Sequence, residues 1–273
     1  MLTHGKLVHR YEPTDVRLGR HRRLDARSLD YLHRHDATTV LRTVRHEIPI
    51  PILDQEDLDV QGIDTSVLVR GAKKVTALGS CTANAGTAAL AFLLGAAHLA
   101  KVGLSATDSV LCERYAICLY HEETVDDEFP QQWPPDDTGS SGLGIARALK
   151  KRGLIGSYVH ATTAADRVAL LMHGPGLLGT PWFQAWFSPD PNGFIDSGNW
   201  KSSPLAGGHE ILAIGIDEIA LDAHGRVIPE RTVLRLRNSW STGWGLKGEF
   251  RMRLSTYVTM RRQIDALQLR AKA

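Results

Sequence analysis

The sequence predicts an α+β fold, because helical patterns fill the first half of the chain and strand patterns fill the second. A chain of 273 residues is long enough for one large domain or two modest ones. We expect an irregular N-terminal extension (1–74), a helical subdomain (75–160) and a β-rich subdomain (161–273). The extension has few periodic stretches, and prolines interrupt it, as in "IPIPIL".

Three helices are expected in the helical subdomain. The stretch "TANAGTAALAFLLGAAHLAK" predicts a largely buried helix that begins at or just after Cys81. The stretch "ATDSVLCERYAICLYHEET" predicts a second helix, with Ser105 or Thr107 as its N-cap. The Pro- and Gly-rich loop "FPQQWPPDDTGSSG" then leads into "LGIARALKKRGLI", a third helix that Gly153 closes.

Strand patterns dominate after about residue 155. The segments "GHEILAIGIDEIAL", "TVLRLRNSW" and "GEFRMRL" are rich in β-branched or alternating apolar residues, and a turn, "DAHGR", follows the first of them. These segments predict the main strands of the second half.

The overall composition excludes several classes of protein. The chain is 43% hydrophobic and 23% charged with a formal net charge of +2, which indicates a globular protein without a general attraction to nucleic acids or membranes. The basic stretch "RLGRHRRLDAR" has no aromatic residues for base stacking, so we interpret it as a solvated arm on the surface. No apolar run is long enough to span a membrane, and the first residues lack the apolar core of a signal peptide. We therefore expect a cytoplasmic protein without nucleic-acid or membrane partners; its oligomeric state is left open.

The chain has three cysteines, an odd number with no zinc-ligand spacing. This pattern predicts neither a disulfide framework nor a metal site, and no cofactor is expected. Cys112 and Cys118 lie in an apolar helical pattern and are expected to be core thiols. Cys81 is different, because it stands at the expected start of a helix, where the thiolate form of a cysteine is stabilised.

Two distant residues could complete a site with Cys81. His209 begins an expected strand and could withdraw the thiol proton, and Asn238 could hold the other ring nitrogen of the imidazole. Trp240 and Trp244 would shield that hydrogen bond from water. Taken singly, each of these residue types is more often structural than catalytic.

Together, the segments "GSCTANA", "GGHE" and "NSWSTGWGLKGEFRM" resemble those of the papain-like cysteine peptidases, in the form found in bacteria and phages. The third segment resembles the "NSWGTGWGxxGYxRI" box of that family almost residue for residue. His209 follows Cys81 by 128 residues and Asn238 follows His209 by 29, in the order that the family has.

The resemblance implies a helical subdomain that carries Cys81 and packs against an antiparallel β-barrel-like subdomain that carries His209 and Asn238. By the same resemblance, Cys81 would attack the peptide carbonyl to form a thioester acyl-enzyme, His209 would move the proton and Asn238 would orient the ring. The Cys81 backbone N–H would donate to the oxyanion. The implied partner is a polypeptide substrate, which would pair with the residues Gly139, Ser140, Ser141 and Gly208.

One part of the family pattern is missing near Cys81. Six residues before the nucleophile the family has a glutamine that completes the oxyanion hole, and here that position is Val75. Thr76 or Gln61 are the nearest replacements. Losing such a donor typically costs about 10² to 10³ in turnover.

This departure leaves two alternatives to a peptidase. The first is a non-catalytic protein that keeps the fold for binding or assembly, for example in a virus or phage particle. The second is a thiol hydrolase of cell-wall peptides.

Overall fold

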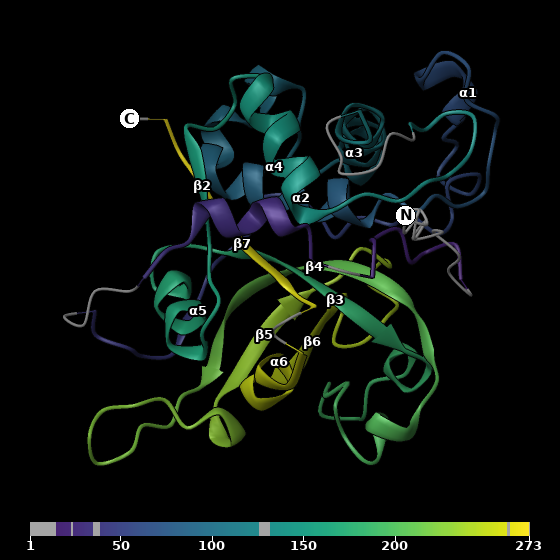
Figure 1. Ribbon diagram of the computed structural model, residues 1–273. Coiled ribbons are helices and arrows are strands. Elements are labelled where there is room, and N and C mark those ends of the chain that lie inside the picture. The colour runs from purple at the N-terminus through teal and green to yellow at the C-terminus, as the bar shows by residue number, and fades with distance from the viewer. Residues whose placement is uncertain (1–14, 23, 35–38, 126–131, 261–262, 273) are drawn as a thin grey trace, which may run out of the picture.

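The protein consists of a helical layer on one side and a single antiparallel sheet on the other, as a computed structural model shows (Figure 1). The structure describes residues 15–22, 24–34, 39–125, 132–260 and 263–272. Its elements, with η for 3₁₀-helices, are η1 (Ala26–Tyr31), β1 (Val44–Arg45), α1 (Thr65–Leu68), α2 (Cys81–Leu94), η2 (Ala96–Val102), α3 (Ser109–Glu123), α4 (Gly142–Lys151), β2 (Ser157–His160), α5 (Ala164–Leu171), β3 (Gly176–Phe183), η3 (Gln184–Phe187), η4 (Trp200–Ser202), β4 (Leu205–Glu218), η5 (Pro229–Arg231), β5 (Val233–Arg237), β6 (Glu249–Arg253), α6 (Leu254–Met260) and β7 (Asp265–Arg270).

Within the described ranges the sheet has seven strands, in the order β2-β7-β3-β4-β5-β6 with β1 added to β4. Every named pair is antiparallel. The long strand β4 lies between β3 and β5 and is buried along most of its length. The α+β class predicted from the sequence is confirmed. The barrel-like description is too strong. Among the described strands, the two edge strands β2 and β6 do not pair with each other, so the sheet stays open.

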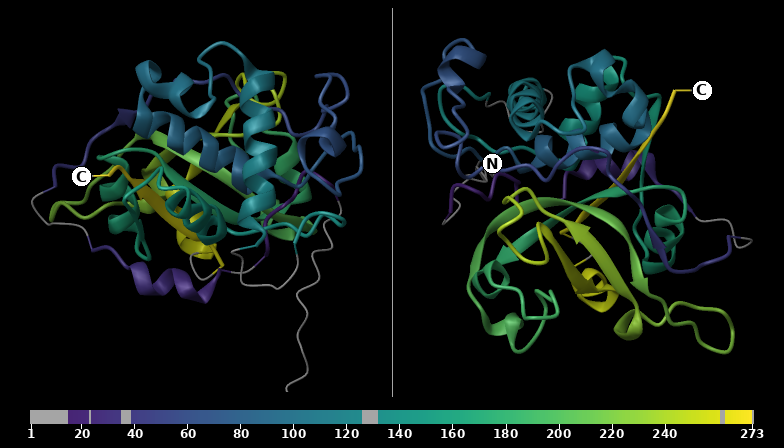
Figure 2. Two further views of the ribbon diagram at one scale, coloured as in Figure 1. Left: turned by 90° about the horizontal axis from the view of Figure 1, so that it is seen from above. Right: turned by 180° about the vertical axis from the view of Figure 1, so that it is seen from behind.

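Hydrophobic cores lie on both faces of this sheet. Leu212 and Ile214 of β4 pack with the helical layer, whereas Ile211 and Ala213 pack into the second core on the opposite face. This alternation is the period of two that a strand imposes on its side chains. The helices α5 and α6 pack on the second face, away from α2, α3 and α4 (Figures 1 and 2).

Helix α2 is buried, as expected, but it is shorter than its pattern suggested. It begins at Cys81 and ends at Leu94, because Gly95 has φ +68°, a left-handed value that favours glycine. The chain continues as the separate 3₁₀-helix η2. A small residue inside α2 has a clear packing role, since a methyl group on Gly86 would lie 2.2 Å from Ile145 of α4.

Of the other two expected helices, α3 begins with a different N-cap from the predicted one, and α4 ends where predicted. Helix α3 is capped by Asp108, whose side chain accepts a hydrogen bond from the backbone of Leu111, and not by Ser105 or Thr107. The Ser105 hydroxyl instead accepts from the backbone of Asp108, in the turn before the helix. Helix α4 ends just before Gly153, which has φ +69°, as predicted. Residues 129–131 of the loop that precedes α4 lie outside the described residues.

The expected strands correspond to β4, β5 and β6, and further strands complete the sheet. Strand β3 was not predicted, because "GLLGTPWF" contains glycine and proline and has no β-branched run. Strand β7 lies between β2 and β3, so this last strand is inserted next to the edge strand β2.

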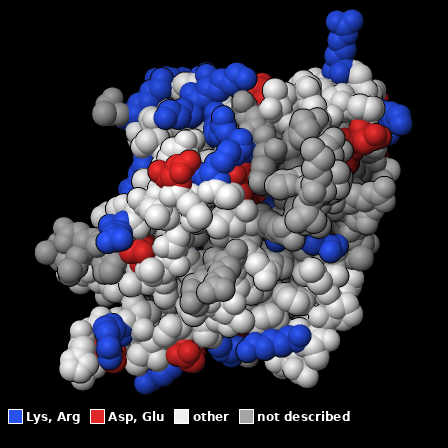
Figure 3. Space-filling model, in the orientation of Figure 1, with Lys and Arg blue, Asp and Glu red and all other residues white. Residues whose placement is uncertain are grey.

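Lys and Arg side chains gather over the helical layer on the face that Figure 3 shows. Part of this charge lines an open groove around Arg147, Lys150 and Lys151 at the end of α4. None of the helices in the described parts of the chain combines the length and apolar character needed to cross a membrane.

Candidate active site

Cys81 occupies the first position of α2 and is fully buried. The backbone N–H of Glu210 on β4 donates a hydrogen bond to its Sγ at 3.4 Å. The junction between the helical layer and the sheet therefore places the thiol against the strand that carries His209. The first N–H groups of a helix have no intrahelical acceptor, so this position also offers donors for a negative charge.

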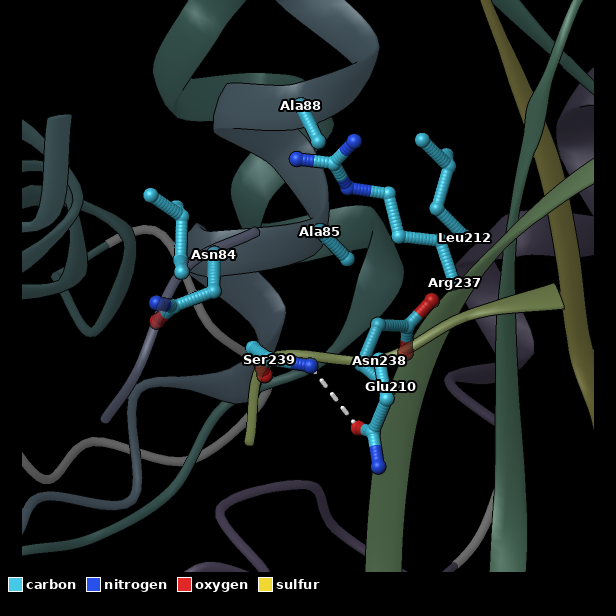
Figure 4. Close-up of a pocket in the computed structure, with 9 residues that line it drawn as sticks. Asn84, Ala85, Ala88, Glu210, Leu212, Arg237, Asn238 and Ser239 are labelled. Carbon is cyan, nitrogen blue, oxygen red and sulfur yellow. Dashed lines mark hydrogen bonds between the residues drawn. The ribbon is translucent and has the colours of Figure 1, made fainter. Parts of the chain in front are cut away.

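His209 and Asn238 form a hydrogen-bonded pair inside the sheet. His209 Nε2 lies 2.7 Å from Asn238 Oδ1, and both residues are buried. The backbone N–H of Ser239 donates to the same Oδ1 at 2.9 Å, the dashed line of Figure 4. Because that oxygen is an acceptor for both groups, Nε2 must carry the proton and Nδ1 must hold a lone pair. His209 Nδ1 has no hydrogen-bond partner among the described residues.

Aromatic rings enclose this pair. Trp240 stacks on the His209 ring at a centroid distance of 4.6 Å, and Trp182 meets the ring edge-on at 4.9 Å. Trp244 lies one layer further out, 5.2 Å from the Trp240 ring, and donates from Nε1 to the Phe187 carbonyl oxygen. Sequence reasoning missed Trp182, which comes from the unpredicted strand β3 and reaches the imidazole only through the β3–β4 pairing.

Burial keeps both ionisable groups neutral. It raises the pKa of the Cys81 thiol above its ordinary value, and the backbone N–H groups of Glu210 and Gly19 offset this only in part. Burial also lowers the pKa of the His209 imidazole to about 3, although the hydrogen bond with Asn238 acts in the opposite direction. In this arrangement the pair is a thiol and a neutral imidazole.

An N-terminal segment, residues 15–22, covers the thiol. The backbone N–H of Arg20 donates to the Gly208 carbonyl oxygen at 3.1 Å, and that of His21 donates to the Ser140 carbonyl oxygen at 2.9 Å. Ser140 in turn donates to the Gly19 carbonyl oxygen at 2.8 Å. Gly19 fits so closely that a methyl group on it would lie 1.5 Å from the Gly79 carbonyl oxygen.

The expectation of a solvated arm is therefore wrong for this segment. Arg20 is only 1% exposed and His21 only 8%. Arg17 is half-buried: its guanidinium lies over the Trp240 ring at 4.9 Å and pairs with Glu56. Arg17 and Arg20 of this stretch are therefore held by partners from distant parts of the sequence.

Two of the four expected substrate-pairing residues bond to the N-terminal segment, and the other two bond within the helical layer. Ser140 and Gly208 face each other across the N-terminal segment and bond to its backbone. The Gly139 N–H is taken by the Tyr120 hydroxyl, and the Ser141 side chain caps α4 by accepting from Gly144.

A buried glutamine that the sequence did not single out lies close to Cys81. Gln55 Nε2 donates to the carbonyl oxygens of Leu78 at 2.9 Å and Arg17 at 3.0 Å, and its Oε1 accepts from the Ser239 hydroxyl. Gln61, one of the two expected replacements, instead donates to the carbonyl oxygens of Asp54 and Asp57 in its own loop. Thr76, the other, is exposed.

A cavity of about 10 Å³ lies between α2 and the sheet, and Asn238 is one of its lining residues (Figure 4). Asn84, Ala85 and Ala88 of α2 face Arg237 and Asn238 of the sheet across it. This volume is about that of a single water-sized probe, so no substrate group fits there.

Neither a family model nor a curated protein matches the chain in sequence. Comparison with solved structures gives a clear answer. Xylellain, a cysteine protease from Xylella fastidiosa, matches with a TM-score of 0.62 and 16% identity over 96% of this chain and 98% of that one. The chain has a papain-like fold.

A second papain-like structure supports the same fold. Digestive procathepsin L 3 from the larval midgut of Tenebrio molitor matches with a TM-score of 0.53 and 12% identity, over 93% of this chain and 76% of that one. The papain-like fold thus accounts for nearly the whole chain, including most of the segment before Cys81.

Proposed function

We propose that the protein is a cysteine-type peptidase in which Cys81 is the nucleophile, His209 the general base and acid, and Asn238 the group that orients the imidazole. The single observation that carries the proposal is the pair His209 Nε2–Asn238 Oδ1, at 2.7 Å. This bond leaves the lone pair of Nδ1 available, on the strand whose next residue bonds to Cys81 Sγ.

The reaction follows from these positions. His209 Nδ1 takes the thiol proton as Sγ attacks the carbonyl carbon of a peptide bond, and the imidazolium keeps its bond to Asn238. The imidazolium then protonates the leaving nitrogen, and a thioester between Sγ and the acyl half remains. A water molecule, deprotonated by His209, attacks the thioester, and the proton returns to sulfur as the acid product leaves.

Two donors would stabilise the oxyanion. One is the backbone N–H of Cys81 at the start of α2, and the other is Gln55 Nε2. In the structure a peptide carbonyl oxygen, that of Arg17, lies 3.0 Å from this Nε2. Gln55 therefore takes the role that the sequence left to Thr76 or Gln61.

The N-terminal segment would have to leave before a substrate enters. With the segment in place Cys81 is fully buried and its thiol is neutral. Displacing the segment admits water and substrate and removes the burial that holds the pKa values of the thiol and the imidazole apart.

The test uses a full-length Gly19→Val variant, in which the added side chain clashes with the Gly79 carbonyl and displaces the segment. We expect this variant to hydrolyse a denatured protein substrate, and a peptidyl epoxide to label Cys81. Adding Cys81→Ala should abolish both. Adding Cys112→Ala should abolish neither, because Cys112 is a buried thiol of α3. Hydrolysis that survives Cys81→Ala would show that another residue is the nucleophile.

A second candidate function is binding or assembly without catalysis. The observation in its favour is that the N-terminal segment bonds to Ser140 and Gly208 and leaves Cys81 fully buried. It predicts that Gly19→Val gains no hydrolysis and that Cys81→Ser preserves every biological effect.

A further inference from the structure

The side chain of Arg20 fills a pocket beside the candidate active site. Its Nη2 lies 3.0 Å from Asp265 Oδ2 on β7, and its Nε lies 3.4 Å from Glu210 Oε2 on β4. The side chains of all three residues are 0% exposed. Two ion pairs therefore fix the N-terminal segment to strands that lie far from it in the sequence.

The walls of the pocket fit a guanidinium group. A methyl group on Gly179 of β3 would lie 2.0 Å from Arg20 Nε, so only glycine leaves room there. The Gln263 carbonyl oxygen accepts from Nη2 at 3.1 Å. The pocket thus matches the shape of the Arg20 side chain and supplies acceptors for its N–H groups.

The pocket would be short of positive charge without Arg20. Among the described residues, the guanidinium of Arg167 would then still act on Glu210. Glu210 Oε1 and Asp265 Oδ1 already accept no hydrogen bond from the described residues. Burial, and after it the negative charge of Asp265, raises the pKa of Glu210 well above its ordinary value, so Asp265, which accepts from Arg20 Nε and Nη2, is the carboxylate that chiefly attracts a cation to the empty pocket.

The pocket opens next to the thiol. Glu210 follows His209 in the chain, and its backbone N–H bonds to Cys81 Sγ. Gly19, the neighbour of Arg20, has its backbone beside the same thiol, where it lowers the pKa of Cys81. A peptide chain that passes the sulfur along this path places an adjacent side chain in the pocket.

We propose that this pocket is a substrate subsite that selects an arginine side chain one or two residues from the bond that Cys81 attacks, and that Arg20 fills it in the covered state. The position of the bond rests on the proposed peptidase function. The recognition of a guanidinium group does not, and it can be tested separately.

The binding test uses full-length Arg20→Ala, which empties the pocket. N-ethylguanidinium should raise the unfolding temperature of this variant by roughly 2–4 °C at ten times its dissociation constant, whereas N-ethylurea, of similar shape but neutral, should not. Wild type, with Arg20 in place, should show no such difference. The double variant Arg20→Ala/Asp265→Asn should lose most of the effect, because Asp265 Oδ2 accepts both hydrogen bonds that Arg20 Nε and Nη2 donate to a carboxylate. Equal shifts from the two compounds in Arg20→Ala would overturn the proposal.

The second test compares matched peptides that carry arginine or norleucine at one position near the scissile bond, with Gly19→Val, which opens the site, and Gly19→Val/Arg20→Ala. We expect the arginine peptides to have a kcat/KM higher by about 10²-fold, since a buried charge pair is lost with norleucine, and Asp265→Asn to reduce that preference. Hydrolysis of both peptides at similar rates would refute the subsite and leave the peptidase standing. Hydrolysis of neither, with N-ethylguanidinium still raising the unfolding temperature, would refute the peptidase and leave the guanidinium site. If Arg20→Ala does not fold, the peptide comparison with Gly19→Val decides.

Discussion

Replacing Gln55 by alanine tests the proposed oxyanion hole most directly. The substitution removes the side-chain donor that now faces a peptide carbonyl oxygen, that of Arg17. Loss of one such donor typically lowers kcat by about 10² to 10³. The side chain makes three hydrogen bonds, to Arg17, Leu78 and Ser239. With these bonds worth about 1 kcal/mol each, we also expect roughly 3 kcal/mol less stability.

The two effects are separated by measuring kcat on chains whose folding has been checked by thermal unfolding, in a Gly19→Val background that opens the site. Gln61→Ala is the matched control, because its amide bonds only within its own loop. We expect Gln61→Ala to change kcat by less than about twofold, as for a residue that does not contact the reacting atoms. A large fall in kcat for Gln61→Ala with an unchanged kcat for Gln55→Ala would refute the reasoning.

Three further predictions concern the site and its surroundings. Asn238→Ala removes the acceptor that fixes the proton on His209 Nε2; kcat should fall by about 10²-fold with little change in KM, measured by steady-state hydrolysis in the Gly19→Val background. Arg17→Ala removes the ion pair with Glu56 and the contact with the Trp240 ring; iodoacetamide should then alkylate Cys81 faster than in wild type, and an unchanged rate would mean that Arg17 does not hold the segment down. Burial raises the pKa of Glu113 to about 7. Between pH 4.5 and 7 the folded state then keeps a proton that the unfolded state has released, so stability falls as the pH rises, by about 3 kcal/mol over the window. Denaturant unfolding of wild type and Glu113→Gln should show this slope in wild type and a reduced one in the variant.

The three proposed catalytic residues were predictable because each carries its own local pattern. Cys81 stands before a long small-residue helix, His209 before an apolar strand, and Asn238 opens a box rich in Trp and Gly. The proposed roles of these residues depend on the sequence immediately around them.

Gln55 was missed because its place depends on a long-range closure. It precedes Cys81 by 26 residues, but the Leu78 N–H donates to the Gln55 carbonyl oxygen and brings the two ends of that stretch together. The only local signal is a glutamine directly after the proline-interrupted run "IPIPILD". A fixed spacing of six residues from the nucleophile pointed to Val75, and no spacing rule allows for an inserted loop.

The burial of Cys81 under residues 15–22 was not predicted, for a different physical reason. Composition alone gives an arginine-rich stretch a solvated surface position, since an unpaired buried guanidinium is costly. Arg20 is buried because two carboxylates, Glu210 and Asp265, converge on it from β4 and β7. That convergence depends on the pairing of β3 with both β4 and β7, and β3 itself has no clear strand pattern.

The contacts of the N-terminal segment link access to the site with the chemistry of the thiol. The segment excludes water from Cys81 and His209, and burial moves their pKa values in the directions that favour the neutral pair. A thiolate–imidazolium pair needs the opposite conditions, namely water, substrate dipoles and the donors at the start of α2. Release of the segment would therefore open the path for a substrate and favour the charged pair in the same step. The segment therefore does more than block access to Cys81. A variant that loosens it should raise both the accessibility of Cys81 and the fraction of Cys81 present as thiolate. The pH dependence of the alkylation rate would separate the change in thiolate fraction from the change in accessibility.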